Sequence, residues 1–302
     1  MSRIAITGAT GLIGQALTAS LTADGHTVQR VTRRRQAAGD DDVLWDPSSR
    51  SIEAAKLEGV DAVVHLAGEP LGDARWTQET KRRIHDSREV GTRLIAETLA
   101  SLDRPPSVLV SSSGVNYYGD RGDEVLTEDS SPGDDFLASV CIAWEAAAQP
   151  ASDAGIRTVQ ARTGVVIAKE GPLIDKVELP FKLGVGGRIG NGYQYVSWIA
   201  LDDHIRALRF LIDRDLSGPV NLVGPEPVTN RELTKALGSV LRRPTVLPIP
   251  TLAVKALYGE MGAVLAATSL RVVPQRLLDA GFTFEHTTLT SALEVVFDRS
   301  AV

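Results

Sequence analysis

Cysteine is almost absent from this sequence: Cys141 is the one cysteine among 302 residues. A lone cysteine cannot form a disulfide within the chain, so we expect a reducing compartment, the cytoplasm. The five histidines are scattered without the spacing of a ligand set. The sequence therefore predicts no metal site.

Long apolar runs and an excess of basic charge are missing as well. No apolar run reaches the roughly 18 residues that a bilayer span needs. Met1 is followed at once by an apolar segment, which leaves no room for a signal peptide. The formal net charge is −6, whereas a nucleic-acid-binding surface requires a basic face. We expect a globular protein that binds a small molecule and has no membrane or nucleic-acid partner.

A glycine-rich turn near the N-terminus is the most informative feature that the chain does contain. Residues 4–6 have the character of a buried parallel strand, and residues 15–23 continue with helical periodicity. Between them, Gly8 would allow a tight turn, Gly11 the close approach of a pyrophosphate, and Gly14 the packing of helix on strand. The N–H groups that begin the helix would face the phosphates. We predict a dinucleotide-binding turn, which is completed by Thr10, Leu12 and Ile13.

The next predicted strand, residues 26–32, ends in a basic run, Arg33, Arg34 and Arg35. An NAD-specific Rossmann protein usually carries an acidic residue here for the ribose 2′-hydroxyl. A guanidinium can instead pair with a 2′-phosphate and stack on adenine. This pattern favours NADP(H), with Arg33 and Arg34 as the clamps. The alternative is that the arginines form a solvated surface turn.

Two further strand ends are expected to line the cofactor. A short buried strand over residues 62–66 ends in small residues, and a second one over 107–110 runs into three serines. Ligands of open α/β sheets bind at the carboxyl ends of the strands, where small residues let a cofactor lie against the backbone. The predicted cofactor-binding residues here are Leu66, Ala67, Gly68, Ser111 and Ser112.

The glycine spacing and the stretch Asp61-Ala-Val-Val-His-Leu-Ala-Gly68 resemble the extended branch of the short-chain dehydrogenase/reductase superfamily. This resemblance implies that Ser113 hydrogen-bonds the reacting carbonyl or hydroxyl. Relatives also carry Tyr-x-x-x-Lys on the next helix, where the lysine lowers the pKa of the tyrosine and holds the ribose. Counted back from Trp144-Glu145, these two positions fall on Leu137 and Cys141, so both residues of the pair are missing.

The stretch Phe136-Leu-Ala-Ser-Val-Cys-Ile-Ala-Trp-Glu145, together with the double tyrosine and Arg75-Trp76-Thr77, resembles an atypical branch of this superfamily, the epimerase-family proteins of unestablished substrate. This resemblance covers almost the whole chain. Tyr117 or Tyr118 could supply a phenol in place of the missing tyrosine, or could pack on the cofactor or at a domain interface. Cys141 could contact the cofactor ribose, or could be a small core residue. Relatives also pair through two helices, here residues 81–102 and 136–148, so a homodimer is possible.

The alternation of strands and helices predicts an α/β fold: a doubly wound parallel sheet (Rossmann) with right-handed crossovers. We expect residues 1–167 and 200–223 to form an NADP-binding domain, and residues 168–199 and 224–302 to form a smaller C-terminal substrate or lid domain. The predicted function is that of an NADP(H)-dependent oxidoreductase or epimerase-like enzyme acting on an unidentified small polar substrate. The alternative is a non-catalytic NADP(H)-binding redox sensor or scaffold.

Overall fold

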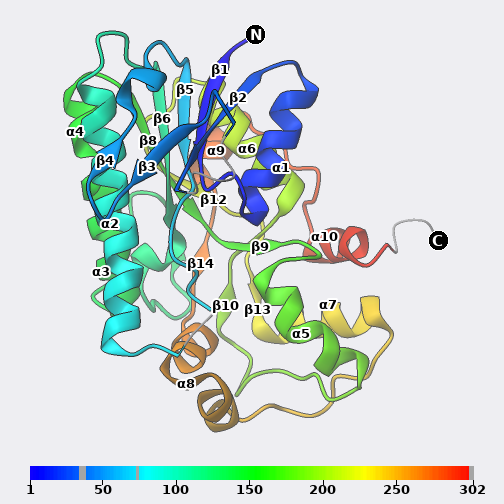
Figure 1. Cartoon of the computed structure of the whole chain (residues 1–302). Coiled ribbons are helices and arrows are strands. Elements are labelled where there is room, and N and C mark those ends of the chain that lie inside the picture. The colour runs from blue at the N-terminus through cyan, green and yellow to red at the C-terminus, as the bar shows by residue number, and fades with distance from the viewer. Residues whose placement is uncertain (34–38, 73–74, 299–302) are drawn as a thin grey trace.

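The structure is a computed structural model, and it describes residues 1–33, 39–72 and 75–298. Its centre is an eight-stranded sheet in the order β12-β8-β6-β5-β1-β2-β3-β4 (Figure 1). Seven of these strands pair in parallel, and β4 runs antiparallel to β3. The bounds are β1 Arg3–Thr7, β2 Thr27–Thr32, β3 Val43–Asp46, β4 Ser51–Ile52, β5 Ala62–His65, β6 Val108–Gly114, β8 Arg157–Thr163 and β12 Gly218–Leu222.

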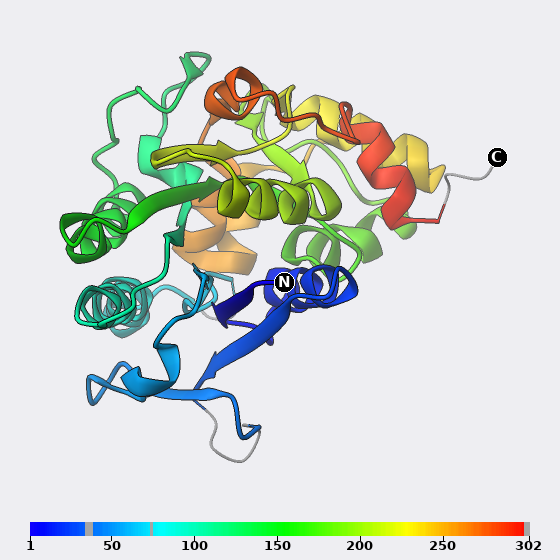
Figure 2. The same cartoon turned by 90° about the horizontal axis from the view of Figure 1, so that it is seen from above.

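Helices cover both faces of this sheet (Figures 1 and 2). Alternation along β1 divides the core, because Ile4 and Ile6 point to one face while Ala5 points to the other. The first face packs on helices α1 (Leu12–Ala23) and α6 (Leu201–Asp213). The opposite face packs on α2 (Gln78–Ala100) and α4 (Gln149–Asp153), and α3 (Phe136–Ala147) lies against α2. Since both faces are covered, the central strands β1 and β5 are buried over nearly their whole length, and the predicted doubly wound fold is confirmed.

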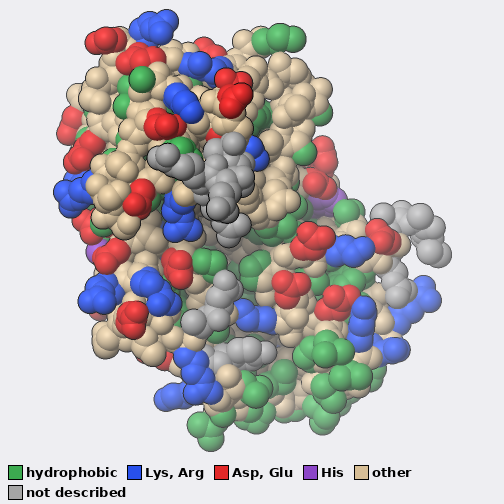
Figure 3. Space-filling view, viewed as in Figure 1, with side chains coloured by type: hydrophobic (Ala, Val, Ile, Leu, Met, Phe, Trp, Pro, Cys, Tyr) green, Lys and Arg blue, Asp and Glu red, His purple; other side chains and the backbone are tan. Residues whose placement is uncertain are grey.

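A second lobe lies beyond the carboxyl ends of the parallel strands, which run toward it in Figure 1. In its core, Trp198 packs in one apolar cluster with Ile174 of α5, Leu237 of α7 and Leu293 of α10. Apolar side chains gather on the surface at its far end (Figure 3). The exposed apolar residues include Leu179 of α5 and Leu252 of α8. The elements are β9 Val165–Ile167, α5 Pro172–Lys182, β10 Tyr195–Val196, β11 Trp198–Ala200, β13 Val228–Thr229, α7 Asn230–Leu241, α8 Thr251–Ala267 and α10 Leu289–Val296.

Short elements connect the two lobes. Strands β7 (Val125–Leu126) and β14 (Arg271–Val272) pair in parallel, and helix α9 (Gln275–Asp279) packs against β12. Leu277 and Phe282 thereby enter the core beneath the large sheet, although both lie in the predicted lid segment. The domain boundaries stay a prediction, and so does the homodimer. Within the described residues, no helix combines the length and the hydrophobicity that a bilayer span requires.

Candidate functional site

The three glycines of the N-terminal turn are required for different reasons. Gly8 has a left-handed φ of +67°, and a Cβ there would lie 2.9 Å from the carbonyl carbon of Leu66. A Cβ at Gly14 would overlap the carbonyl oxygen of Gly8, so only glycine allows the helix to start this close to the turn. At Gly11 the only atom of the described residues within 4 Å of a Cβ would be the same oxygen, 3.4 Å away, and this residue is exposed. The first turn of α1 therefore begins at an open surface.

The Thr7 hydroxyl, at the carboxyl end of β1, forms hydrogen bonds to the end of β5 and the residues that follow it. Its Oγ1 accepts the backbone N–H groups of Leu66 (3.0 Å) and Ala67 (3.1 Å) and lies 2.8 Å from Nδ1 of His65. Because both lone pairs are used, the hydroxyl donates its hydrogen to Nδ1, which must be unprotonated. Burial lowers the pKa of His65 to about 4, so the ring is neutral. These contacts support a structural role for His65 at the point where ligands of such sheets bind.

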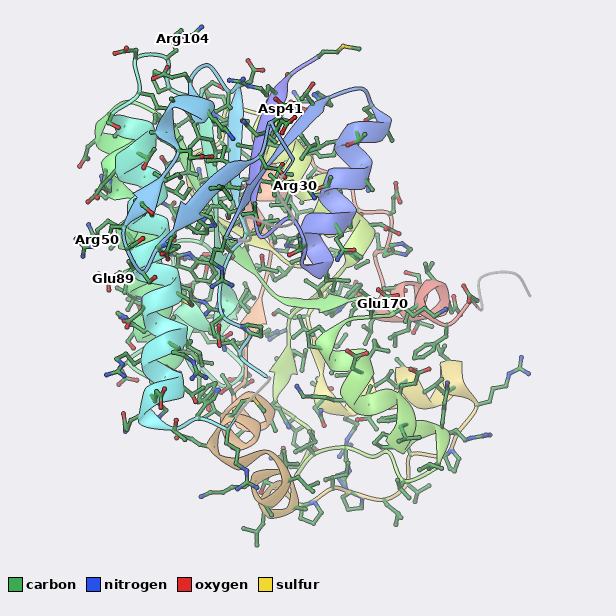
Figure 4. The ribbon with its side chains drawn as sticks, in the orientation of Figure 1. Arg30, Asp41, Arg50, Glu89, Arg104 and Glu170 are labelled. Atoms are coloured by element: carbon green, nitrogen blue, oxygen red, sulfur yellow. The ribbon has the colours of Figure 1, made fainter. Side chains whose placement is uncertain are left out.

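The remaining predicted residues of the cofactor half lie around this junction. Leu66 and Ala67 are half-buried and Gly68 is exposed, directly after β5. Arg33 is exposed at the end of β2, and Arg34 lies outside the described residues. Sequence reasoning did not single out Arg30, which forms an ion pair of 2.6 Å with Asp42. Arg30 projects from β2 beside α1 (Figure 4), and it lines a groove together with Ala9, Thr10, Gln15 and Thr18.

A buried ion pair holds the predicted catalytic serine. Ser113 Oγ donates to Oε1 of Glu145 at 2.7 Å, and Arg162 binds the same carboxylate through Nε and Nη2, both at 2.8 Å. Burial alone would lower the pKa of Arg162, but the hydrogen bonds and charge of Glu145 outweigh it and raise that pKa. Because the hydroxyl hydrogen of Ser113 goes to the carboxylate, its oxygen is left as a hydrogen-bond acceptor.

The two adjacent tyrosines have different surroundings. Tyr118 is fully buried; its hydroxyl donates to Oδ1 of Asn221 at 2.7 Å and accepts from Nη1 of Arg162 at 3.0 Å. Burial raises its pKa to about 12 against the opposing effect of Arg162. These contacts favour an anchoring role for Tyr118 over proton transfer. Tyr117 is half-buried with its ring centroid 3.5 Å from Cζ of Arg162, and its hydroxyl makes no hydrogen bond to any described residue.

Helix α3 supplies neither a phenol nor a cation to the site. Leu137 is buried in an apolar cluster with Trp76 and Ile84. Cys141 is buried beside Gly114, and burial raises the pKa of its thiol to about 12, so the sulfur is neutral at physiological pH. The other two predicted serines precede Ser113 on β6: Ser111 is buried and Ser112 half-buried.

Arg88 is a buried cation that sequence reasoning missed. Its side chain extends from α2, and Nη1 donates to the carbonyl oxygens of Glu69 (3.0 Å) and Ile84 (3.1 Å). Cζ lies 3.4 Å from where a Cβ on Gly68 would be, and 4.9 Å from the centroid of the Trp144 ring. A signal did exist in the sequence, since Arg88 falls on the buried stripe of its helix, four residues after Ile84.

Known proteins resemble this chain both in sequence and in fold. The family model described as NAD dependent epimerase/dehydratase family matches residues 4–224, and a domain of unknown function (DUF1731) matches residues 249–296. Epimerase family protein Mb2239 of Mycobacterium bovis is 43% identical over 291 residues, which is 96% of each chain. Human epimerase family protein SDR39U1 is 35% identical over 298 residues, 97% of this chain and 99% of the human one. The crystal structure of that human protein with NADPH superposes with a TM-score of 0.89 at 34% identity, covering 98% and 99% of the two chains.

Proposed function

The chain belongs to the NAD dependent epimerase/dehydratase family, as an atypical extended short-chain reductase, and from this premise we propose that it is an NADP(H)-dependent oxidoreductase or epimerase-like enzyme. Its substrate would be a small polar molecule. The observation that carries the proposal is the glycine turn, where crowding excludes a side chain at Gly8 and Gly14 while the space over Gly11 is open. A turn that only connected strand to helix would not need that open glycine.

The residues around the turn fit a nicotinamide dinucleotide. The N–H groups of Leu12 and Ile13 begin α1 with no side-chain cap over them, as an anion at a helix N-terminus requires. The backbone of Leu66 to Gly68, held by Thr7, would lie against one half of the cofactor. Ser111 and Ser112 would line it from the neighbouring strand β6. When bound, such a cofactor supplies or accepts a hydride.

Preference for NADP(H) over NAD(H) is part of the same proposal. Arg33 directly follows β2, where an acidic residue would select NAD(H), and Arg30 adds a guanidinium beside the glycine turn. The similar human protein was crystallised with NADPH. Arg34, the second predicted clamp, is included in this proposal because of its position in the sequence, since it lies outside the described residues.

The proton would be handled from the end of β6. Ser113 presents an acceptor oxygen, because Glu145 takes its hydrogen, and this oxygen suits a hydroxyl or N–H of the substrate. Tyr117 carries the phenol that Leu137 lacks, and its hydroxyl has no partner in the part of the chain that is described. We therefore favour Tyr117 over Tyr118 as the proton-transferring group.

Titration with NADPH tests the cofactor site. We expect saturable binding, seen as a change in NADPH fluorescence, which Gly11→Asp abolishes because its carboxylate would enter the phosphate position. Gln78→Asp is the matched control, since it adds the same charge at the exposed start of α2. Equal affinity of the wild type and Gly11→Asp would contradict the proposal, and tighter binding of NADH than NADPH would contradict the preference.

The non-catalytic alternative has one observation in its favour. Leu137 and Cys141 are buried and uncharged, so α3 cannot perform the usual proton transfer. Purified protein should be incubated with NADPH and a broad panel of carbonyl compounds, and with NADP+ and the corresponding alcohols, whose hydroxyl can donate to Ser113. Turnover that is lost in Ser113→Ala or Tyr117→Phe would exclude a mere sensor or scaffold, whereas tight NADPH binding without any turnover would favour it.

A further inference from the structure

Arg88 is a buried guanidinium whose hydrogen bonds, among the described residues, go to backbone carbonyls and not to a carboxylate. Its exposed fraction is 8%. Arg162, which is also buried, differs in that both oxygens of Glu145 bind its guanidinium. Burying a cation without a paired anion is costly. The two carbonyls engage only Nη1, so the other N–H groups of the fork have no acceptor in the described part of the chain.

The guanidinium lies at the carboxyl edge of the sheet. Its Cζ lies 3.4 Å from where a Cβ on Gly68, three residues past the end of β5, would be, and 4.9 Å from the centroid of the Trp144 ring on α3. Burial lowers the pKa of Arg88, against smaller opposing effects of Cys141 and of the Glu69 carboxylate, which forms no hydrogen bond with the guanidinium. Cys141 is the position where relatives carry the lysine that holds the ribose. A cation from α2 thus reaches the neighbourhood that a cation from α3 occupies in those relatives.

We propose that Arg88 binds the nicotinamide-side ribose of the cofactor through its free N–H groups and so replaces the missing lysine. This inference rests on the proposed function and adds a cofactor-binding residue to it. The ribose is favoured over the substrate as the ligand because Arg88 lies beside Gly68, whose backbone is proposed to line the cofactor half of the site. Ribose hydroxyls accept hydrogen bonds from a guanidinium without needing a negative charge.

Two ligands separate the two halves of the cofactor site. NADPH contains the nicotinamide ribose, whereas 2′,5′-ADP contains only the adenosine half with its 2′-phosphate. In Arg88→Met, we expect the Kd of NADPH to rise about tenfold to a hundredfold, the range for a lost hydrogen bond to a charged group, and the Kd of 2′,5′-ADP to change less than about twofold. Arg88→Lys keeps the charge and should lose less. Arg93→Met is the matched control, because Arg93 lies on α2 with 41% of its side chain exposed.

Each outcome of the titrations decides the inference. An unchanged Kd for NADPH in Arg88→Met would overturn it, and so would an equal loss for both ligands, which would indicate general damage to the site. Retained binding of 2′,5′-ADP is itself evidence that a variant is folded. If Arg88→Met does not fold, Arg88→Lys decides by the same comparison. Wild-type protein that binds neither ligand would refute the proposed function together with this inference, whereas wild-type binding with an unaffected Arg88→Met refutes the inference alone.

Discussion

Removal of the Glu145 carboxylate should destabilise this protein far more than the loss of an ordinary ion pair. Glu145→Ala leaves Arg162, whose side chain is 3% exposed, as a buried cation without its anion. Breaking a buried pair in this way costs about 3–5 kcal/mol. We expect the lower end, about 3 kcal/mol, because Nη1 of Arg162 keeps the hydroxyl of Tyr118 and the carbonyl of Glu128 as acceptors.

Urea unfolding measures this effect. With a slope of about 3 kcal/mol per molar urea, the midpoint should fall by about 1 M. The control is Glu178→Ala, which removes the partner of Lys182 on the surface of α5, where side chains are 35% and 56% exposed. That change should cost less than about 1 kcal/mol. A double variant, Glu145→Met with Arg162→Met, should cost less than the sum of its single changes. Equal midpoint shifts for Glu145→Ala and Glu178→Ala would refute the reasoning.

Three further predictions concern the turn, a buried histidine and the lone cysteine. In thermal unfolding, Gly14→Ala should lower the free energy of unfolding by about 2 kcal/mol or more, since its Cβ would lie 2.7 Å from Cα of Ala9. Gly11→Ala should lower it by less than about 0.5 kcal/mol in that assay. The folded-state pKa of His65, about 4, lies below its ordinary value of 6.5; its stabilising contribution is therefore present above about pH 6.5 and lost as the pH falls toward 4. The wild type should lose up to about 3 kcal/mol more than His65→Gln over that range. Cys141 should react with Ellman's reagent at pH 8 on the order of a hundredfold more slowly in the folded protein than in the unfolded chain, because its thiol is buried and protonated.

A specific result would contradict the prediction for the turn, for His65 and for Cys141. Equal losses of stability for Gly11→Ala and Gly14→Ala would show that the turn can relax around a methyl group. Parallel pH profiles for the wild type and His65→Gln would mean that His65 does not carry the acid sensitivity. Rapid labelling of Cys141 in folded protein would show that the thiol is accessible, and its assignment as neutral and buried would then be wrong.

Local chemistry was enough to predict the region where the cofactor is proposed to bind. The first strand, the glycine turn and the following helix all lie within residues 3–23, and each depends on neighbours in the chain. The predicted strand over residues 26–32 is β2, Thr27–Thr32. The absence of the Tyr-x-x-x-Lys pair was equally readable, because the spacing of two residues on one helix does not depend on tertiary contacts.

The polar network behind that region could not be predicted, because its members are distant in sequence. Ser113 and Arg162 are direct partners only through the register of β6 with β8, and Glu145 reaches them from α3. Arg88 could be recognised as a charge on a buried helical stripe. Whether it met a carboxylate, a carbonyl or a ring depended on which elements packed around it, since hydrogen bonds and charges act over a few ångströms of space regardless of separation along the chain.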